Sequence, residues 1–250
     1  MRWWATFDGK EAVAPSHLSM VTNRGTWGEN IEFANISLSD NNSQATINFG
    51  DYGVEIRAFD NGVAYRFLSH SEGDYKIIDE VAEFAFSEED MAWIPYVNYR
   101  PDATSDYATQ YETSFENIYT HTALKDIDWR RLIFTPIIVE HNGLKLWISE
   151  ANLEAYPGMF ISNRDQNGLL DTEFAPRPKE VEQGGHNMLQ GMVKSRHNYI
   201  AVCHGKRTFP WRIVAIGTKD SDLANNNLVW VLADECRIED TSWIEPGKVA

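Results

Sequence analysis

The residue most suggestive of chemistry is Glu150, an acid at the end of an apolar strand face. Leu144, Leu146 and Ile148 alternate with other residues, and side chains two positions apart in a strand lie on one face. Continuing the alternation places Glu150 on that face. Either the strand ends and Glu150 points to solvent, or a cation or a partner domain compensates its charge. Asn152, two positions further on, would lie on the same face and offer a further oxygen to such a cation.

The sequence lacks the common catalytic motifs. There is no G-x-S-x-G, no P-loop, no G-x-G-x-x-G and no H-E-x-x-H. Cys203 and Cys236 lie in segments that resemble strands, without metal-binding spacing, so free buried thiols are expected and a zinc site is not. The sequence leaves a disulfide between them open. The histidines show no ligand spacing and are interpreted as surface or hydrogen-bonded residues: His17, His70, His121, His141, His186, His197 and His204.

The composition restricts the classes of partner. A chain of 250 residues, 43% of them hydrophobic, can bury one sizeable core. The net charge of −15 argues against nucleic acid and anionic membranes, because phosphate binding requires clustered Lys and Arg. Nine Trp and ten Tyr suit β-sheets and also surfaces that stack on sugar rings. The N-terminus has no apolar run typical of a signal peptide, and no segment has the length of a membrane span.

The pattern of turns and alternating residues predicts an all-β fold, a large antiparallel β-sandwich. Asp or Asn followed by Gly, or His followed by Gly, marks hairpin turns at residues 8–9, 60–62, 142–143, 167–168 and 204–205. No window carries a helical stripe, and residues 35–50 have the most loop-like composition. Strands are predicted at residues 54–58, 63–67, 132–139, 144–149, 199–203, 213–216 and 228–232.

Five short segments resemble the N-terminal domain of glycoside hydrolase family 97, and they occur in that family's order. They are DNGVAYRF at 60–67, ISEANLEAYPGM at 148–159, FAPRP at 174–178, FPWR at 209–212 and WIEPGK at 243–248. The resemblance implies a β-supersandwich similar to galactose mutarotase domains, occupying residues 1–250 as one accessory domain. The chain begins near the family's second strand, which leaves room for a missing first strand.

The resemblance also implies a function. Family members are exo-acting α-glycosidases, and their catalytic acids lie in a (β/α)₈ barrel that follows this domain. A barrel needs roughly 200 further residues, so no catalytic residue is expected in this chain and the isolated chain should be inactive. The partners implied are the barrel and an α-linked glucoside or galactoside, and the location implied is periplasmic or secreted.

Site residues follow from the same resemblance. Glu150 matches the position that supplies one ligand to a calcium ion. The loop 163–177 would line the sugar pocket, with Asp171, Thr172 and Glu173 as substrate contacts. A docked barrel would also require an exposed apolar patch that includes Trp243, Pro246 and residues 156–158.

Two other functions remain open on the sequence alone. A free-standing carbohydrate-binding sandwich would present a solvent-facing aromatic platform. An aldose epimerase would bring a His acid and a Glu base together in one pocket. Similarity of fold does not decide among the three.

Overall fold

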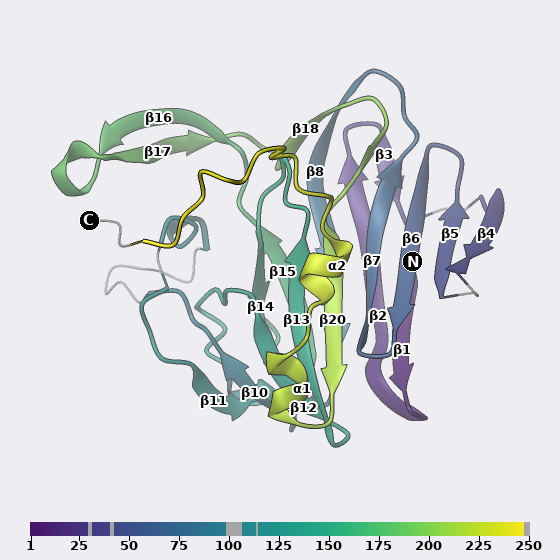
Figure 1. The fold of residues 1–250 in the computed structure, drawn as a ribbon. Helices are drawn as coiled ribbons and strands as arrows, with labels where there is room; N and C mark the ends of the chain where they lie inside the picture. Colours follow the sequence, from purple (N-terminus) through teal and green to yellow (C-terminus); the bar gives the residue numbers. More distant parts are fainter. Residues whose placement is uncertain (30–31, 41–42, 99–106, 114, 248–250) are drawn as a thin grey trace.

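A computed structural model describes residues 1–29, 32–40, 43–98, 107–113 and 115–247, which form two large antiparallel sheets and a separate hairpin (Figure 1). Ile77 and Leu18 from one sheet and Phe67 and Ile148 from the other belong to one buried cluster, so the two sheets share a core. No helix of the described residues is long and apolar enough to span a bilayer.

The eight-stranded sheet is built around the long strand β2. Its main order is β14-β15-β9-β2-β8-β18, and β1 and β3 also pair with β2. The strands are β1 (Arg2–Phe7), β2 (Lys10–Thr22), β3 (Gly25–Trp27), β8 (Asp74–Ala82), β9 (Phe84–Ala85), β14 (Met159–Ser162), β15 (Leu169–Phe174) and β18 (Ala201–His204).

The ten-stranded sheet has β20 near its centre, paired with β13 on one side and β7 on the other. Its main order is β11-β10-β12-β13-β20-β7-β6-β5-β4, and β19 pairs with β7. The strands are β4 (Asn35–Ser39), β5 (Gln44–Asn48), β6 (Tyr52–Phe59), β7 (Gly62–Ser69), β10 (Met91–Ile94), β11 (Thr120–Ala123), β12 (Ile137–His141), β13 (Leu144–Ala151), β19 (Arg207–Thr208) and β20 (Trp211–Gly217).

The third sheet is a two-stranded hairpin, β16 (Pro178–Gly184) and β17 (Gln190–Arg196), which projects from the sandwich at the upper left of Figure 1. Single-turn 3₁₀ segments occur at Tyr107–Thr109, Leu124–Asp126 and His186–Met188. Two short helices, α1 (Asp220–Ala224) and α2 (Leu228–Leu232), follow β20.

The all-β prediction and most predicted strands are confirmed. Residues 54–58, 63–67, 144–149 and 213–216 lie inside β6, β7, β13 and β20. The predicted strand 199–203 begins only at Ala201. The predicted strand 132–139 begins only at Ile137, because Pro136, directly before it, has no N–H to donate to a sheet ladder. The loop-like prediction for residues 35–50 is wrong, since β4 and β5 lie there at the sheet edge.

Two smaller predictions are also wrong. The turn at His204-Gly205 does not close a hairpin, because β18 pairs with β8 in one sheet and β19 pairs with β7 in the other. Both cysteines are free thiols, but only Cys203 lies in a strand and is buried; Cys236 is exposed and belongs to no strand.

The predicted strand at 228–232 is the helix α2. Leu228 and Leu232 are buried at a spacing of four, whereas Trp230 is 80% exposed, which is the pattern of a helix lying on a surface. A strand had no edge to join here, because β20 is already paired on both sides. The apolar run therefore covers the outer face of the sheet instead of extending it, packing with Trp211 and Ala64.

The packing of α2 on the sheet predicts that substitutions at its buried and exposed positions change stability by different amounts. Leu228→Ala should lower the free energy of unfolding by about 2–5 kcal/mol, because a buried side chain is lost and a cavity remains. Val231→Ala, at a half-exposed position of α2, should change it by about 0.5 kcal/mol or less. Urea unfolding of both variants measures this, and equal effects would contradict the packing.

Candidate functional site

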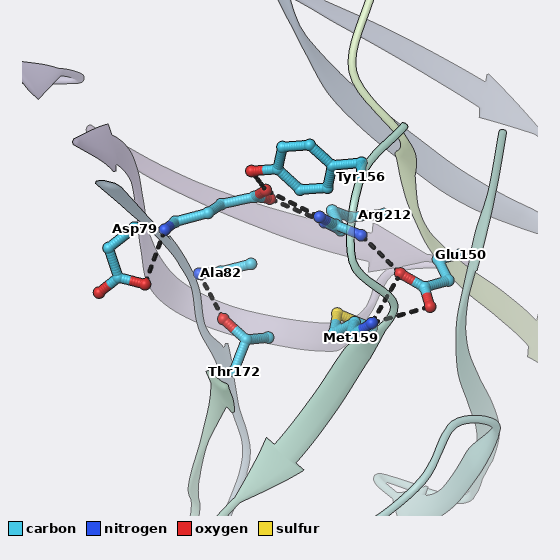
Figure 2. Close-up of polar contacts among 8 residues, drawn as sticks. Asp79, Ala82, Glu150, Tyr156, Met159, Thr172 and Arg212 are labelled. Atoms are coloured by element: carbon cyan, nitrogen blue, oxygen red, sulfur yellow. Dashed lines mark hydrogen bonds and ion pairs between the residues drawn. The ribbon is translucent and has the colours of Figure 1, made fainter. Parts of the chain in front are cut away.

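Arg212 is a fully buried charge near the start of β20, and its side chain is 1% exposed. Its Nε and Nη2 donate to Oε1 and Oε2 of Glu80 on β8, each at 2.8 Å, so one guanidinium joins the two sheets. Its third nitrogen, Nη1, donates to Oε2 of Glu150 at 2.7 Å (Figure 2). Tyr156 completes the group by donating its hydroxyl to Oε2 of Glu80 at 2.7 Å. All three arginine nitrogens therefore have carboxylate partners, as a buried charge requires.

Glu150 is held in a fixed orientation by the cluster. Its side chain is 8% exposed, and the backbone N–H of Met159 donates to Oε1 at 2.9 Å and to Oε2 at 3.1 Å. Leu144, Leu146 and Ile148 of the same face are buried, as the alternation predicts. The solvent-facing interpretation is wrong, because Arg212 compensates the charge of Glu150 inside the chain; the calcium assignment stays a prediction.

The charges of this cluster do not cancel. Two carboxylates, Glu80 and Glu150, face one guanidinium, which leaves one net negative charge in a buried setting. Burial raises the pKa of Glu150 above its usual range, although Arg212 and the Met159 N–H oppose the shift. Burial disfavours the guanidinium charge, but Glu80 and Glu150 outweigh it and the pKa of Arg212 is raised.

A cavity of about 710 Å³ opens beside Glu150. Its lining combines the 155–160 segment with aromatic side chains, the loop after β15 and the start of the β16–β17 hairpin. The residues used below are Tyr111, Phe134, Glu150, Gly158, Phe160 and Pro176. Gly158 also lines the cavity, and a Cβ at that position would lie 3.4 Å from Oε1 of Glu150, in direct contact with that oxygen.

Comparison with known families decides what kind of domain carries this cluster. A profile described as "Glycosyl-hydrolase 97 N-terminal" matches residues 1–234. The chain belongs to the glycosyl-hydrolase 97 N-terminal family. A curated relative from Bacteroides thetaiotaomicron, a "Retaining alpha-galactosidase", is 38% identical over 98% of this chain. The chain spans 40% of the length of that relative, so it corresponds to the N-terminal part of a larger glycosidase.

Solved structures support the fold of this GH97 N-terminal domain. A glycoside hydrolase family 97 enzyme from Pseudoalteromonas sp. strain K8, in complex with acarbose, aligns with a TM-score of 0.74 at 21% identity. The alignment covers 98% of this chain and 37% of that enzyme. A beta-arabinopyranosidase aligns with a TM-score of 0.61 at 18% identity, over 86% of this chain and 36% of its own.

The three predicted substrate contacts lie in β15 of this GH97 domain, away from the lining of the Glu150 cavity. Thr172 accepts the backbone N–H of Ala82 with its hydroxyl at 3.0 Å, as Figure 2 shows. Glu173 pairs with Arg164 at 2.8 Å. Asp171 is half-buried beside other acids. The structure therefore does not bring these three together with Glu150, whereas Pro176 of the same predicted loop does line the cavity.

The oxygen atoms near Glu150 limit what a metal ion would find in this chain. Asn152 exchanges two hydrogen bonds of 2.9 Å with Asp234, so its amide is already engaged. Both oxygens of Glu80 accept from Arg212, and one also accepts from Tyr156. No group of three or more His, Cys, Asp or Glu suited to a metal occurs among the described residues. Glu150, with three of its roughly four acceptor positions used, fits the role of a single ligand.

Sequence reasoning found Glu150 but missed the residues that hold it. Arg212 stands in the segment WRIVAIG, and an arginine inside an apolar strand signals a buried ion pair. Its partner Glu80 is 132 residues away in the chain, and no local pattern connects the two. Tyr156 belongs to the predicted barrel-facing patch, but it is buried in the core, so that part of the prediction is wrong.

Removing the guanidinium should be severely destabilising. Arg212→Met leaves Glu80 and Glu150 buried without their cation, which should lower the free energy of unfolding by about 3–5 kcal/mol. Arg237→Met provides the matched control, because Arg237 pairs with Glu154 at the surface and should cost little. Chemical unfolding of both variants at neutral pH is the measurement, and a mild effect of Arg212→Met would refute the role assigned to it.

Asp171 should make stability depend on pH. Burial, with repulsion from Glu83, Asp165 and Glu173, raises its pKa from the ordinary 3.8 to about 6. Because the folded state then binds the proton more tightly than the unfolded state, stability contributed at low pH is lost as pH rises from about 4 through 6. Asp171→Asn should abolish this loss, about 1–2 kcal/mol after allowance for solvent screening. Parallel stability curves for the two proteins between pH 3.5 and 7 would show that the carboxyl is not perturbed.

Proposed function

We propose that this chain is the accessory domain of an α-glycosidase, which packs on a catalytic barrel, supplies Glu150 to a calcium site and forms part of the sugar pocket wall. The observation that carries the proposal is the orientation of Glu150. Its carboxylate is fixed by Arg212 and by the Met159 N–H, and Glu150 lines the 710 Å³ cavity. The chain is inactive alone, because hydrolysis needs two carboxylates flanking the scissile bond and these belong to the barrel.

A hard divalent cation suits this position for two reasons. The Glu80, Glu150 and Arg212 cluster carries one net negative charge, so a cation at Glu150 would offset it. Calcium takes six to eight oxygen ligands, and Glu150 offers one. The remaining ligands would come from the barrel. When bound, calcium would supply positive charge at the sugar pocket, and the role of this chain is to hold the Glu150 carboxylate in place for it.

The aromatic side of the same cavity supports a role in sugar binding. Phe160 lies between Tyr111 and Phe134, with ring centroids 5.7 and 5.3 Å apart. Such rings provide flat apolar surfaces for the C–H faces of a sugar, and Pro176 extends the wall. The 38% identity with a retaining α-galactosidase favours an α-galactoside as the substrate of the whole enzyme.

The surface near the C-terminal end is suited to packing against a further domain. Trp243 is 68% exposed and Ile244 is 53% exposed, in a segment that leaves the sheet on the side of Figure 1 where the β16–β17 hairpin projects. Exposed apolar side chains of this size mark interaction surfaces. An epimerase has less support, since no histidine of the described residues lines the Glu150 cavity.

The calcium assignment can be tested by calorimetry. The isolated chain should bind calcium weakly or not at all, because it provides too few oxygens. In a full-length family member that binds calcium, Glu→Gln at the position of Glu150 should weaken calcium binding by at least about tenfold. The same substitution at the position of the exposed Glu154 is the control and should have no effect. Tight calcium binding by the isolated chain, or unchanged affinity after substitution at the Glu150 position, would exclude the assignment.

A further inference from the structure

A row of three ring-bearing side chains and one isoleucine crosses four strands on the outer face of the ten-stranded sheet. His121 on β11 is paired in register with Trp93 on β10, Trp93 with Ile138 on β12, and Ile138 with Trp147 on β13. At about 4.8 Å between strands, the row is roughly 14 Å long. None of the four belongs to the main core between the sheets. Trp147 packs in part against the second hydrophobic cluster beneath the two helices, whereas Trp93 is an exposed ring in neither cluster and requires an explanation other than core packing.

Three members of the row, Trp93, Ile138 and Trp147, form the floor of a groove of about 460 Å³. Trp93 and His121 stack with their centroids 4.3 Å apart and an interplanar angle of 17°, and Trp93 is 39% exposed. Trp147 lies at the other end of the floor, where Leu223 of α1 forms a wall. The groove therefore has an exposed aromatic ring at the Trp93 end and a half-buried one at the Trp147 end, and its volume lies within the range of small-molecule sites.

Charged groups along one side of the groove are fixed relative to the rings. Oε1 of Glu140 accepts from Nε1 of Trp93 at 3.3 Å and from Nζ of Lys145 at 3.3 Å. Lys145 also pairs with Asp220 of α1 at 2.7 Å. These groups keep unused acceptor and donor capacity for the hydroxyls of a ligand.

We infer that this groove binds a neutral oligosaccharide, with pyranose rings stacked on Trp93 and Trp147 and hydroxyl groups bonded to Glu140, Lys145 and Asp220. Sugar rings present a C–H face to aromatic rings and hydroxyls at their edges, which matches an aromatic floor with a charged side. Two carboxylates against one ammonium disfavour an anionic ligand.

This groove lies on the opposite face of the sheet from Glu150. Trp147 and Glu150 are three residues apart on β13, so their side chains leave opposite faces. The inference does not depend on the calcium site or on the barrel, and its test uses the 250-residue chain alone. A failure of either proposal would leave the other standing.

Titration of maltotriose and raffinose into the ¹⁵N-labelled chain should shift the indole N–H resonances of Trp93 and Trp147, identified with Trp→Phe variants. Sorbitol, which has hydroxyls but no ring, and trigalacturonate, which is anionic, should bind at least about tenfold more weakly than the better neutral sugar. Trp93→Ala should weaken binding of the better neutral sugar by at least about tenfold. Trp230→Ala is the matched control, since Trp230 is exposed on α2 and does not line the groove. Asp220→Asn, at an exposed position, should also weaken binding while leaving the fold intact.

The inference is overturned if neither sugar shifts these resonances at 20 mM. It is also overturned if Trp93→Ala and Trp230→Ala have equal effects while the circular dichroism of both matches the parent. Concentration-dependent sedimentation that is abolished by Trp93→Ala, without any sugar effect, would assign the groove to contact between copies of the chain instead.

Discussion

The burial of Arg212 between two sheets is the constraint on which the rest of this structure depends. A guanidinium that is 1% exposed must have all its nitrogens paired, and Glu80 from the opposite sheet and Glu150 from the neighbouring strand provide the partners. The same bonds fix the relative position of β8, β13 and β20 and determine the orientation of Glu150. A stabilising element of the core therefore also sets the geometry of the candidate site, and the two cannot be changed independently.

Much of the fold was predictable because it follows from local chemistry. Alternation in β13 predicted the strand and left two directions open for Glu150, and the Asp60-Asn61-Gly62 turn correctly joined β6 to β7. The helix α2 was not predictable from its own five residues, since an apolar run fits either a buried strand or a helix. The full pairing of β20 decided between them, and that is a property of the whole sheet.

The candidate site was predictable only in part, for the same reason. Glu150 was visible as an acid on an apolar face, but Glu80 reaches Arg212 across 132 residues of sequence. Asp171, Thr172 and Glu173 were predicted from their place in a loop, yet that segment is the strand β15, where Thr172 and Glu173 make bonds within the sandwich. The outer groove could not be predicted without the strand register, because His121, Trp93, Ile138 and Trp147 form a row only once four strands are aligned. The parity of β13 then separates the chain's two proposed roles, with Glu150 on its inner face and the aromatic row on its outer face.

The most direct test of the central claim is a double-mutant cycle between Glu80 and Arg212. Free energies of unfolding would be measured for Glu80→Gln, Arg212→Met and the double variant. If Arg212 holds the sheets together through Glu80, the two substitutions should be strongly coupled, by about 2–3 kcal/mol. Additive effects, within about 0.5 kcal/mol, would contradict the account, because they would mean that the bidentate pair does not support the cluster that orients Glu150.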